Sequence, residues 1–296
     1  MRGIELACAA IVVAYVALRL RRADGSRMAV AQRLAALACA AWVGEDSVIR
    51  AYGFYGYTPQ WSVWLDQVPL LIVAIWPVVI DSAHGLARQL TSGPVRVALL
   101  AGALVLADAS LIEPIAVHAG LWSWSADEPR ALFAVPLVGV VGWSLFTTAA
   151  VAAFEALDAR GARAAWSFAV VPVAPLATHA ALVVVWWGAF RWFGGGASPW
   201  TPSLVAWGLL GPATVLAWRA GPRVSVASVM ARAPGAAFFF VLLAATARDS
   251  PPLVAYALAF APPYVALVAR AASRALYPPR RSSYLRVSPS RSNPSS

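Results

Sequence analysis

Long apolar runs, separated by short polar or arginine-rich segments, make up most of the chain. A helix that spans a membrane needs about 20 predominantly apolar residues, within a range of about 17–25. Proline and glycine inside such a run do not exclude a span, because neighbouring helices satisfy the backbone groups that these residues free. By this criterion the sequence predicts nine spans, or eight if the short run 234–247 does not cross. The nine are residues 3–20, 28–44, 62–81, 95–113, 131–154, 164–190, 203–218, 234–247 and 252–270.

The amino-acid composition agrees with this pattern. Hydrophobic residues make up 60% of the chain, charged residues only 12%, and the mean hydropathy is +0.69. A soluble globular domain carries about 25% charged residues. We therefore expect an all-α fold, a polytopic bundle of transmembrane helices, with residues 1–276 forming one membrane domain.

The arginines indicate how the bundle is oriented. All 23 lysine-plus-arginine positions are arginine, and most fall on alternate loops. Basic residues are enriched in the cytoplasmic loops of membrane proteins. If the nine spans alternate, 18 arginines lie on the side that follows the first span and 5 lie on the other. The pattern predicts an outer N-terminus and a cytoplasmic C-terminus, and it explains the net charge of +10 without a nucleic-acid partner.

The last segment, 277–296, is rich in proline, serine and arginine. Such a composition cannot bury a core, so we expect a disordered basic cytoplasmic tail that contacts anionic membrane lipid. The first apolar run ends in arginines and not in the small residues of a cleavage site, which predicts a first span and no signal peptide. We expect an integral protein of the bacterial cytoplasmic membrane.

Several membrane chemistries lack the residues that they need. The chain has no lysine for a retinal Schiff base. Its histidines, His84, His118 and His179, are too widely spaced for a metal motif on one helix face. Its cysteines, Cys8 and Cys39, form no CxxC motif, and the sequence contains neither a phosphate-binding loop nor a DDxxD motif. We therefore expect neither a metal nor an organic cofactor.

Carboxylates near the predicted outer face are the candidates for chemistry. Asp108 and Glu113 lie in or at the end of the fourth apolar run, and an ionisable group at membrane depth costs about 2.5–3.5 kcal/mol on insertion scales. Glu45, Asp46 and Asp66 fall on the same predicted side, so we expect these acids to converge on one outer-facing cavity. The aromatic residues expected to line it are Tyr55, Tyr57, Trp122, Trp124 and Trp143.

These residues also have structural interpretations. Glu113 fits a helix end, because Pro114 follows it and the residue before a proline is disfavoured in helices. Trp122 and Trp124 are equally typical of the aromatic belt at a membrane surface. Asp66 is equally consistent with a solvated residue close to the start of the third span. The sequence leaves both kinds of interpretation open.

Carboxylic acids and aromatic rings in an apolar medium suit one kind of reaction. A desolvated carboxylic acid stays neutral and can donate a proton to an alkene. Indole and phenol faces stabilise the cation that forms. If water then adds, the product is an alcohol, and if an internal alkene adds, the product is a ring. Neither outcome needs a metal or a nucleotide.

Several short motifs follow one another in an order that resembles a known family. They are Glu45, GFYGYT at 53–58, VPLLIVAIW at 68–76, Asp108, Glu113-Pro114, Gly120, Trp122, Trp124 and VPL with GW between 135 and 143. This order, over about residues 42–145, resembles the membrane-type carotenoid biosynthesis proteins, which include the carotenoid 1,2-hydratases and are distantly similar to the membrane lycopene cyclases. The family pattern has Asp at the position of Glu113 and Asn at the position of Gly139.

The resemblance implies a membrane lyase that hydrates a terminal double bond of a carotenoid, a lipophilic polyene. It implies Asp108 or Glu113 as the proton donor and Glu45 as the carboxylate that directs water. Asp66 and the five aromatic residues would then bind substrate. Other carotenoid-pathway membrane proteins are expected partners. The alternatives are a carotenoid end-group cyclase or isomerase, and a non-catalytic transporter or assembly protein, although the sequence has no evident internal repeat.

Overall fold

The computed structural model describes residues 1–23, 25–125, 132–192, 198–220 and 224–276, so the predicted tail, 277–296, lies outside the described residues. The described part is an all-α helical bundle, as the sequence predicts. Seven of its helical segments are long and apolar enough to cross a membrane. They are Arg2–Arg21, Leu70–Leu90, Pro94–His118, Leu137–Ala159, Ala164–Trp192, Val226–Thr246 and Pro251–Arg270.

The chain forms helices joined by short strands and turns. The helices are α1 (Arg2–Arg21), α2 (Arg27–Tyr52), α3 (Leu70–Leu90), α4 (Pro94–His118), α5 (Leu137–Ala159), α6 (Val170–Gly188), α7 (Thr201–Ala220), α8 (Val226–Met230), α9 (Ala233–Thr246), α10 (Pro251–Leu258) and α11 (Ala261–Leu276), with 3-10 helices η1 (Ala164–Ala169) and η2 (Phe190–Trp192). The strands are β1 (Tyr55–Tyr57), β2 (Trp64–Leu65), β3 (Val68–Pro69) and β4 (Trp122–Trp124).

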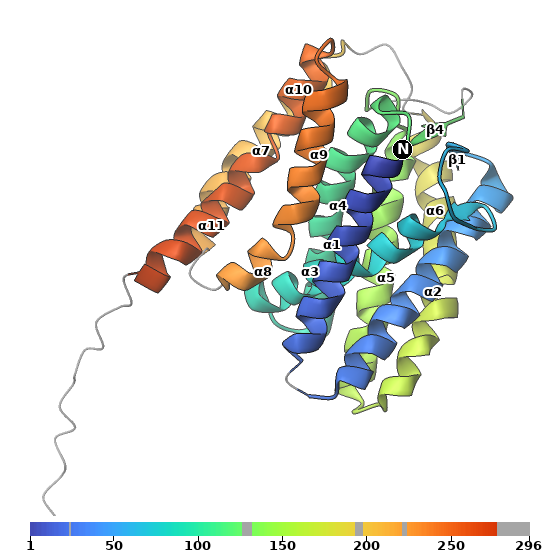
Figure 1. Ribbon diagram of the computed structural model, residues 1–296, viewed down its shortest axis with the longest axis vertical. Helices are drawn as coiled ribbons and strands as arrows, with labels where there is room; N and C mark the ends of the chain where they lie inside the picture. Colours follow the sequence, from blue (N-terminus) through green and yellow to red (C-terminus); the bar gives the residue numbers. More distant parts are fainter. Residues whose placement is uncertain (24, 126–131, 193–197, 221–223, 277–296) are drawn as a thin grey trace, which may run out of the picture.

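The long helices lie side by side and alternate in direction (Figure 1). Helices α2 to α6 pack on one another, α1 packs against α2 and α3, and α7 packs against α11. The N-terminus and strands β1 and β4 lie at one end of the bundle, and the end of α11 lies at the other (Figure 1). This arrangement gathers β1, β4 and the adjoining helix ends in one region.

Small side chains allow the central helices to pack closely. Ala40, Ala83 and Ala101 are fully buried in a core formed by α2 to α6. At Gly102 of α4 a Cβ atom would lie 2.0 Å from the Oγ1 atom of Thr148 on α5. Only a glycine therefore fits here, as expected for helices that associate through small residues.

The third predicted span, 62–81, has the wrong bounds. Strands β2 and β3 form a hairpin in which Trp64 pairs with Pro69, and Asp66 in its turn has a φ of 55°. Helix α3 starts only at Leu70, because the extended backbone of Pro69 precedes its first turn. Pro69 is thus the residue that immediately precedes the helix.

Helix α3 also extends beyond the predicted end, to Leu90, because its polar residues have partners inside the bundle. Asp81 accepts hydrogen bonds from the Tyr15 hydroxyl at 2.7 Å and from Arg19 Nη2 at 3.0 Å. His84 Nε2 lies 2.6 Å from the Oε1 atom of Glu155 on α5. A paired carboxylate or imidazole can be buried where an unpaired one could not.

The last predicted span, 252–270, is divided into two helices, whereas the eighth, 234–247, corresponds to the single helix α9, which the short helix α8 precedes. Helix α8 ends at Met230 and α9 begins at Ala233, and α10 ends at Leu258 before α11 begins at Ala261. Prolines mark both restarts, because Pro234 and Pro262 each occupy the second position of the new helix. A proline is favoured in the first turn of a helix, where its missing N–H would have no partner.

Glu113 does not lie at a helix end, because α4 continues through Pro114 to His118. A proline inside a helix leaves the carbonyl four residues earlier without its usual donor, and here that carbonyl belongs to Ser110. The Tyr256 hydroxyl donates to it at 2.9 Å. The interpretation of Glu113 as a helix-end residue is therefore wrong.

We predict that Tyr256→Phe lowers the free energy of unfolding by about 1–3 kcal/mol, the cost of leaving a buried acceptor without a partner. In a Pro114→Ala background the restored N–H can bond to Ser110, so the same change should cost clearly less. Denaturant unfolding of the four proteins in detergent micelles, read as a double-mutant cycle, measures the difference. Equal costs in both backgrounds would contradict the assignment.

Candidate functional site

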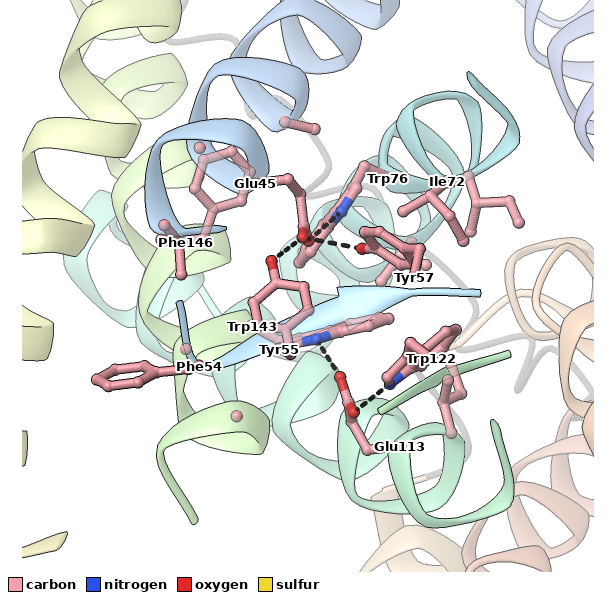
Figure 2. A pocket seen from close by; sticks show the side chains of 18 of the residues that line it. Glu45, Phe54, Tyr55, Tyr57, Ile72, Trp76, Glu113, Trp122, Trp143 and Phe146 are labelled. Carbon is pink, nitrogen blue, oxygen red and sulfur yellow. Dashed lines mark hydrogen bonds between the residues drawn. The ribbon is translucent and has the colours of Figure 1, made fainter. Parts of the chain in front are cut away.

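Two carboxyl groups line one pocket at the end of the bundle that carries β1 and β4. Glu45 comes from α2 and Glu113 from α4, and side chains of β1, β4, α3 and α5 complete much of the wall. The cavity has a volume of about 120 Å³. The two carboxyl groups point toward one another across it (Figure 2). We refer to it as the carboxyl pocket.

The Glu45 carboxyl group accepts three hydrogen bonds. The hydroxyls of Tyr55 and Tyr57 both donate to its Oε2 atom, that of Tyr57 at 2.9 Å. Trp76 Nε1 donates to its Oε1 atom at 3.0 Å. All three donors are neutral groups, so no described cation is paired with this carboxyl group.

The Glu113 carboxyl group also accepts three hydrogen bonds, all from indoles. Trp122 and Trp124 donate to its Oε2 atom at 2.8 and 3.2 Å. Trp143 donates to its Oε1 atom at 2.9 Å. Glu113 is only 3% exposed, and a carboxyl group is tolerated at this depth when its oxygens are hydrogen-bonded.

Each of these carboxyl groups keeps one open position. A carboxylate has about four acceptor sites, two on each oxygen. In both residues Oε2 accepts two of the three hydrogen bonds and Oε1 accepts one, among the described residues. The remaining site on Oε1 can hold an acid proton or accept a hydrogen bond from a ligand, without loss of the existing bonds.

A two-stranded sheet positions four of the six donors. Strands β1 and β4 pair antiparallel, with Tyr55 opposite Trp124 and Tyr57 opposite Trp122. Residues two apart on a strand share a face, and directly opposed residues lie side by side on that face. The four rings therefore face the pocket together, with the Tyr55 and Trp124 ring centroids 4.8 Å apart.

The two tyrosines of β1 remain protonated and serve as hydrogen-bond donors. Burial raises the pKa of Tyr55 and of Tyr57 well above the ordinary phenol value, and the nearby Glu45 charge raises the pKa of both further. Both phenols therefore keep their protons over the physiological pH range. Each hydroxyl can donate to Glu45 whether or not that carboxyl group is ionised.

Trp76 and His179 line the pocket and were not among the predicted site residues. Trp76 donates to Glu45, and its ring lies 4.5 Å from that of Trp143. His179 also lines the pocket, and its two ring nitrogens each lie 2.8 Å from a hydroxyl, of Ser47 and of Tyr52. Trp76 belongs to the motif at 68–76, so the sequence contained a signal that identifies it. Nothing in the sequence indicates that His179 lies beside α2.

Gly139 makes room for the Trp124 ring. A Cβ atom on Gly139 would lie 2.4 Å from Cζ2 and 2.7 Å from Cη2 of that ring. With Trp124 in this position, no side chain fits at 139, and the indole N–H supplies a donor to Glu113.

Asp108 does not line the carboxyl pocket, so its predicted convergence with Glu113 is wrong. Its carboxylate is paired with the Arg232 guanidinium and accepts a hydrogen bond from the Tyr264 hydroxyl at 3.0 Å. Asp108 and Glu113 are five residues apart on α4, which is about 1.4 helical turns. Their side chains therefore leave different sides of the helix.

Asp46 and Asp66 also lie outside the carboxyl pocket, against expectation. Both are paired with Arg50, whose Nε atom lies 2.8 Å from Oδ2 of Asp46. Asp66 is in the β2–β3 turn and exposed, so the solvated interpretation holds for it and the expected substrate-binding position does not. Arg50 holds this hairpin against α2.

The described residues contain no group of three or more His, Cys, Asp or Glu side chains arranged to hold a metal ion. No protein-family model, no curated protein and no solved structure matches the chain. The geometry of the carboxyl pocket is therefore the main basis for a functional proposal. It offers two facing carboxyl groups with neutral donors, surrounded by aromatic and aliphatic side chains.

We predict that Gly139→Ala destabilises the protein by about 1–3 kcal/mol, the usual cost of overpacking a core, because its methyl group would displace the Trp124 ring. Gly142→Ala on the same helix is the matched control, since its Cβ would meet only Leu182 at 3.7 Å. Unfolding of both variants in detergent measures the difference. Truncation of the ring, in Gly139→Ala with Trp124→Leu, should recover part of the loss.

Proposed function

We propose that the chain is an integral membrane enzyme that hydrates a terminal double bond of a carotenoid, without a cofactor, in the carboxyl pocket. The observation that supports this most directly is the pair of facing carboxyl groups, each with one open acceptor position and only neutral partners. Acid-catalysed hydration needs one group to give a proton and another to take one. The sequence resemblance to carotenoid hydratases points to the same reaction.

In this mechanism Glu113, the more deeply buried of the two acids, is the proton donor. The proton on its Oε1 atom passes to the carbon of the double bond that carries a hydrogen, and a C–H bond forms as the double bond is lost. A tertiary cation remains on the neighbouring carbon. Water adds to that carbon, and Glu45 accepts the proton that the water releases. A proton then returns from Glu45 to Glu113 through water, so the net change is the addition of one H₂O.

The aromatic wall supports the cationic intermediate. A cation over an indole or phenol face gains about 2 kcal/mol or more when it is desolvated. Trp76, Trp143, Tyr55 and Trp124 all line the pocket, and their rings pack as two tilted pairs, Trp76 with Trp143 and Tyr55 with Trp124. The same wall suits a cyclisation, in which an internal alkene attacks the cation, and the mass of the product distinguishes the two reactions.

We also infer that the bundle crosses the membrane nine times, with its N-terminus outside. The alternating helix directions and the opposite positions of the N-terminus and the end of α11 support an odd number of crossings (Figure 1). The distribution of 18 arginines against 5 supports the orientation. In this orientation the carboxyl pocket lies in the outer half of the membrane, beneath β1 and β4.

We predict that the chain, expressed in a host that accumulates lycopene or a monocyclic carotene, yields a product heavier by one water. Glu113→Gln and Glu45→Gln keep the size of the side chain but cannot transfer the proton, so each should lower product formation by about 10²-fold or more. Chromatography with mass spectrometry, normalised to the amount of protein in the membrane, gives the measurement.

Glu5→Gln is the matched control, because Glu5 bonds to Ser62 outside the carboxyl pocket, and this variant should retain activity. A product of unchanged mass with altered retention would assign a cyclase or isomerase. Unchanged pigments with the wild-type chain present in the membrane, or full activity of both glutamine variants, would contradict the proposed mechanism.

The proposed topology predicts how introduced cysteines react. In a background with Cys8→Ala and Cys39→Ala, Gln60→Cys should react with a membrane-impermeant maleimide on intact cells. Ser92→Cys, in the turn between α3 and α4, should react only after the membrane is permeabilised. Both positions are exposed in the structure, so a difference reports the side of the membrane. The reverse pattern would overturn the orientation.

A further inference from the structure

The carboxyl pocket extends across the bundle. Residues of both α6 and α9 line it, although these two helices lie on opposite flanks, with α4 and α5 between them (Figure 1). Phe54 lies on one side of the two acids, and Ile72 and Trp122 lie on the other (Figure 2). The pocket therefore leads away from the acids in two directions, which we call the α6 arm and the α9 arm.

The α9 arm is apolar. Its lining includes Cys8, Ile75, Val79, Ile112, Phe238 and Phe239. None of these six side chains has a hydroxyl, an amide or a charge, so they offer water no strong hydrogen bond. Such a surface favours a hydrocarbon, and the body of a polyene suits this arm. A polyene that fills the arm also blocks it, so the water that hydration consumes needs another route.

The α6 arm contains an ionisable residue that the mechanism above does not use. His179 lines this arm together with Thr178 and Leu182, and it lies within the apolar segment Ala164–Trp192. Ionisable residues inside a membrane span are rare, and they mark cavities, substrate routes or proton relays. The α6 arm thus has a strongly polar group where the α9 arm has none.

Two hydroxyls of α2 hold the His179 ring in one protonation state. The Ser47 hydroxyl donates to the Gly44 carbonyl oxygen at 3.0 Å, so the Ser47 oxygen accepts from His179 Nε2–H at 2.8 Å. A neutral imidazole has one donor and one acceptor nitrogen, so Nδ1 accepts from the Tyr52 hydroxyl at 2.8 Å. After these bonds the Ser47 and Tyr52 oxygens each keep an acceptor position for water.

Tyr52, His179 and Ser47 form a polar line that leads toward Glu45. Tyr52 is the last residue of α2, at the end of the bundle that carries β1. Glu45 lies about 10 Å deeper along the helix axis, whereas Ser47 lies only about 3 Å from the level of Glu45. All three residues of the line are half-buried, so each keeps accessible surface. The line therefore connects the end of α2 with the depth of the reacting groups.

We propose that the α6 arm is the route by which water reaches Glu45, that His179 keeps this route polar, and that the α9 arm holds the body of the polyene. The inference rests on the proposed function for its two substrates. His179 is a positioning residue, because it orients the hydroxyls of Ser47 and Tyr52 and takes no proton from the reacting atoms. Water from this route adds to the cation, and Glu45 accepts the proton that the water releases.

Cysteine accessibility tests the two arms without any reaction. In a background with Cys8→Ala and Cys39→Ala, Gly142→Cys places a thiol in the α6 arm and Ile75→Cys places one in the α9 arm. Both positions are half-buried, and a Cβ atom at 142 would meet only Leu182, at 3.7 Å.

The reagent is aminoethyl methanethiosulfonate, which carries a charge, with uncharged N-phenylmaleimide as the reference. The thiolate is the reacting form of cysteine, and it forms where water reaches the sulfur. For the full chain in lipid nanodiscs, mass spectrometry should give a charged-to-uncharged rate ratio about tenfold higher at 142 than at 75. Equal ratios at the two positions would overturn the division into a water arm and a polyene arm.

His179→Leu removes both ring nitrogens, so it should lower the ratio at 142 by about tenfold and leave that at 75 unchanged. His179→Gln keeps a donor and an acceptor and should retain most of the ratio. An unchanged ratio at 142 in His179→Leu would overturn the role of His179. If this variant does not fold, Tyr52→Phe, which removes the hydroxyl and keeps the ring, should lower the ratio at 142 in the same direction.

Pigment analysis gives a second readout. Where the unmodified chain forms product, His179→Leu should lower the ratio of hydrated product to ring or isomer by about tenfold, because the cation still forms but less water reaches it. A purely structural defect would lower both products together, so a constant product ratio would contradict the proposal. If the unmodified chain forms no product, the proposed function fails, and the cysteine rates still decide whether the α6 arm carries water.

Discussion

A buried carboxyl group needs hydrogen-bond donors, and this requirement organises the end of the molecule that carries β1 and β4. Glu45 and Glu113 each receive three donors, and the six donors come from β1, β4, α3 and α5. Loss of one donor exposes a polar atom to an apolar surrounding at a cost of about 1–3 kcal/mol. The positions of four elements are therefore linked to two side chains.

Three partly buried acids have charged partners instead. Asp81 is paired with Arg19, Asp108 with Arg232, and Glu155 with Arg88. An arginine beside a carboxylate fixes the ionised form, because the pair is neutral only when both groups are charged. The two acids of the carboxyl pocket have tryptophan and tyrosine donors instead, so they can gain or lose a proton without breaking an ion pair. This difference separates acids suited to proton transfer from acids that hold helices together.

Apolar periodicity was sufficient to predict the all-α fold, and most of its helices match an apolar run. The rare acids and aromatic residues near the predicted outer face included Glu45, Glu113 and the five aromatic residues that the pocket contains. The predictions that failed depend on three-dimensional packing, which the sequence does not show directly. Asp108 was misplaced because helical phase directs it away from Glu113, and Arg232, counted as a loop charge, proved to be the buried partner of Asp108. The position of His179 beside Ser47 depends on how α2 and α6 pack.

The pairing register of β1 and β4 has a consequence for how the pocket forms. A shift of one residue would turn Gly56 and Ser123 toward the carboxyl groups, in place of the tyrosines and tryptophans. Glu45 and Glu113 would then lose their strand donors at the same moment. The two halves of the site thus depend on one strand pairing, between segments 65 or more residues apart along the chain.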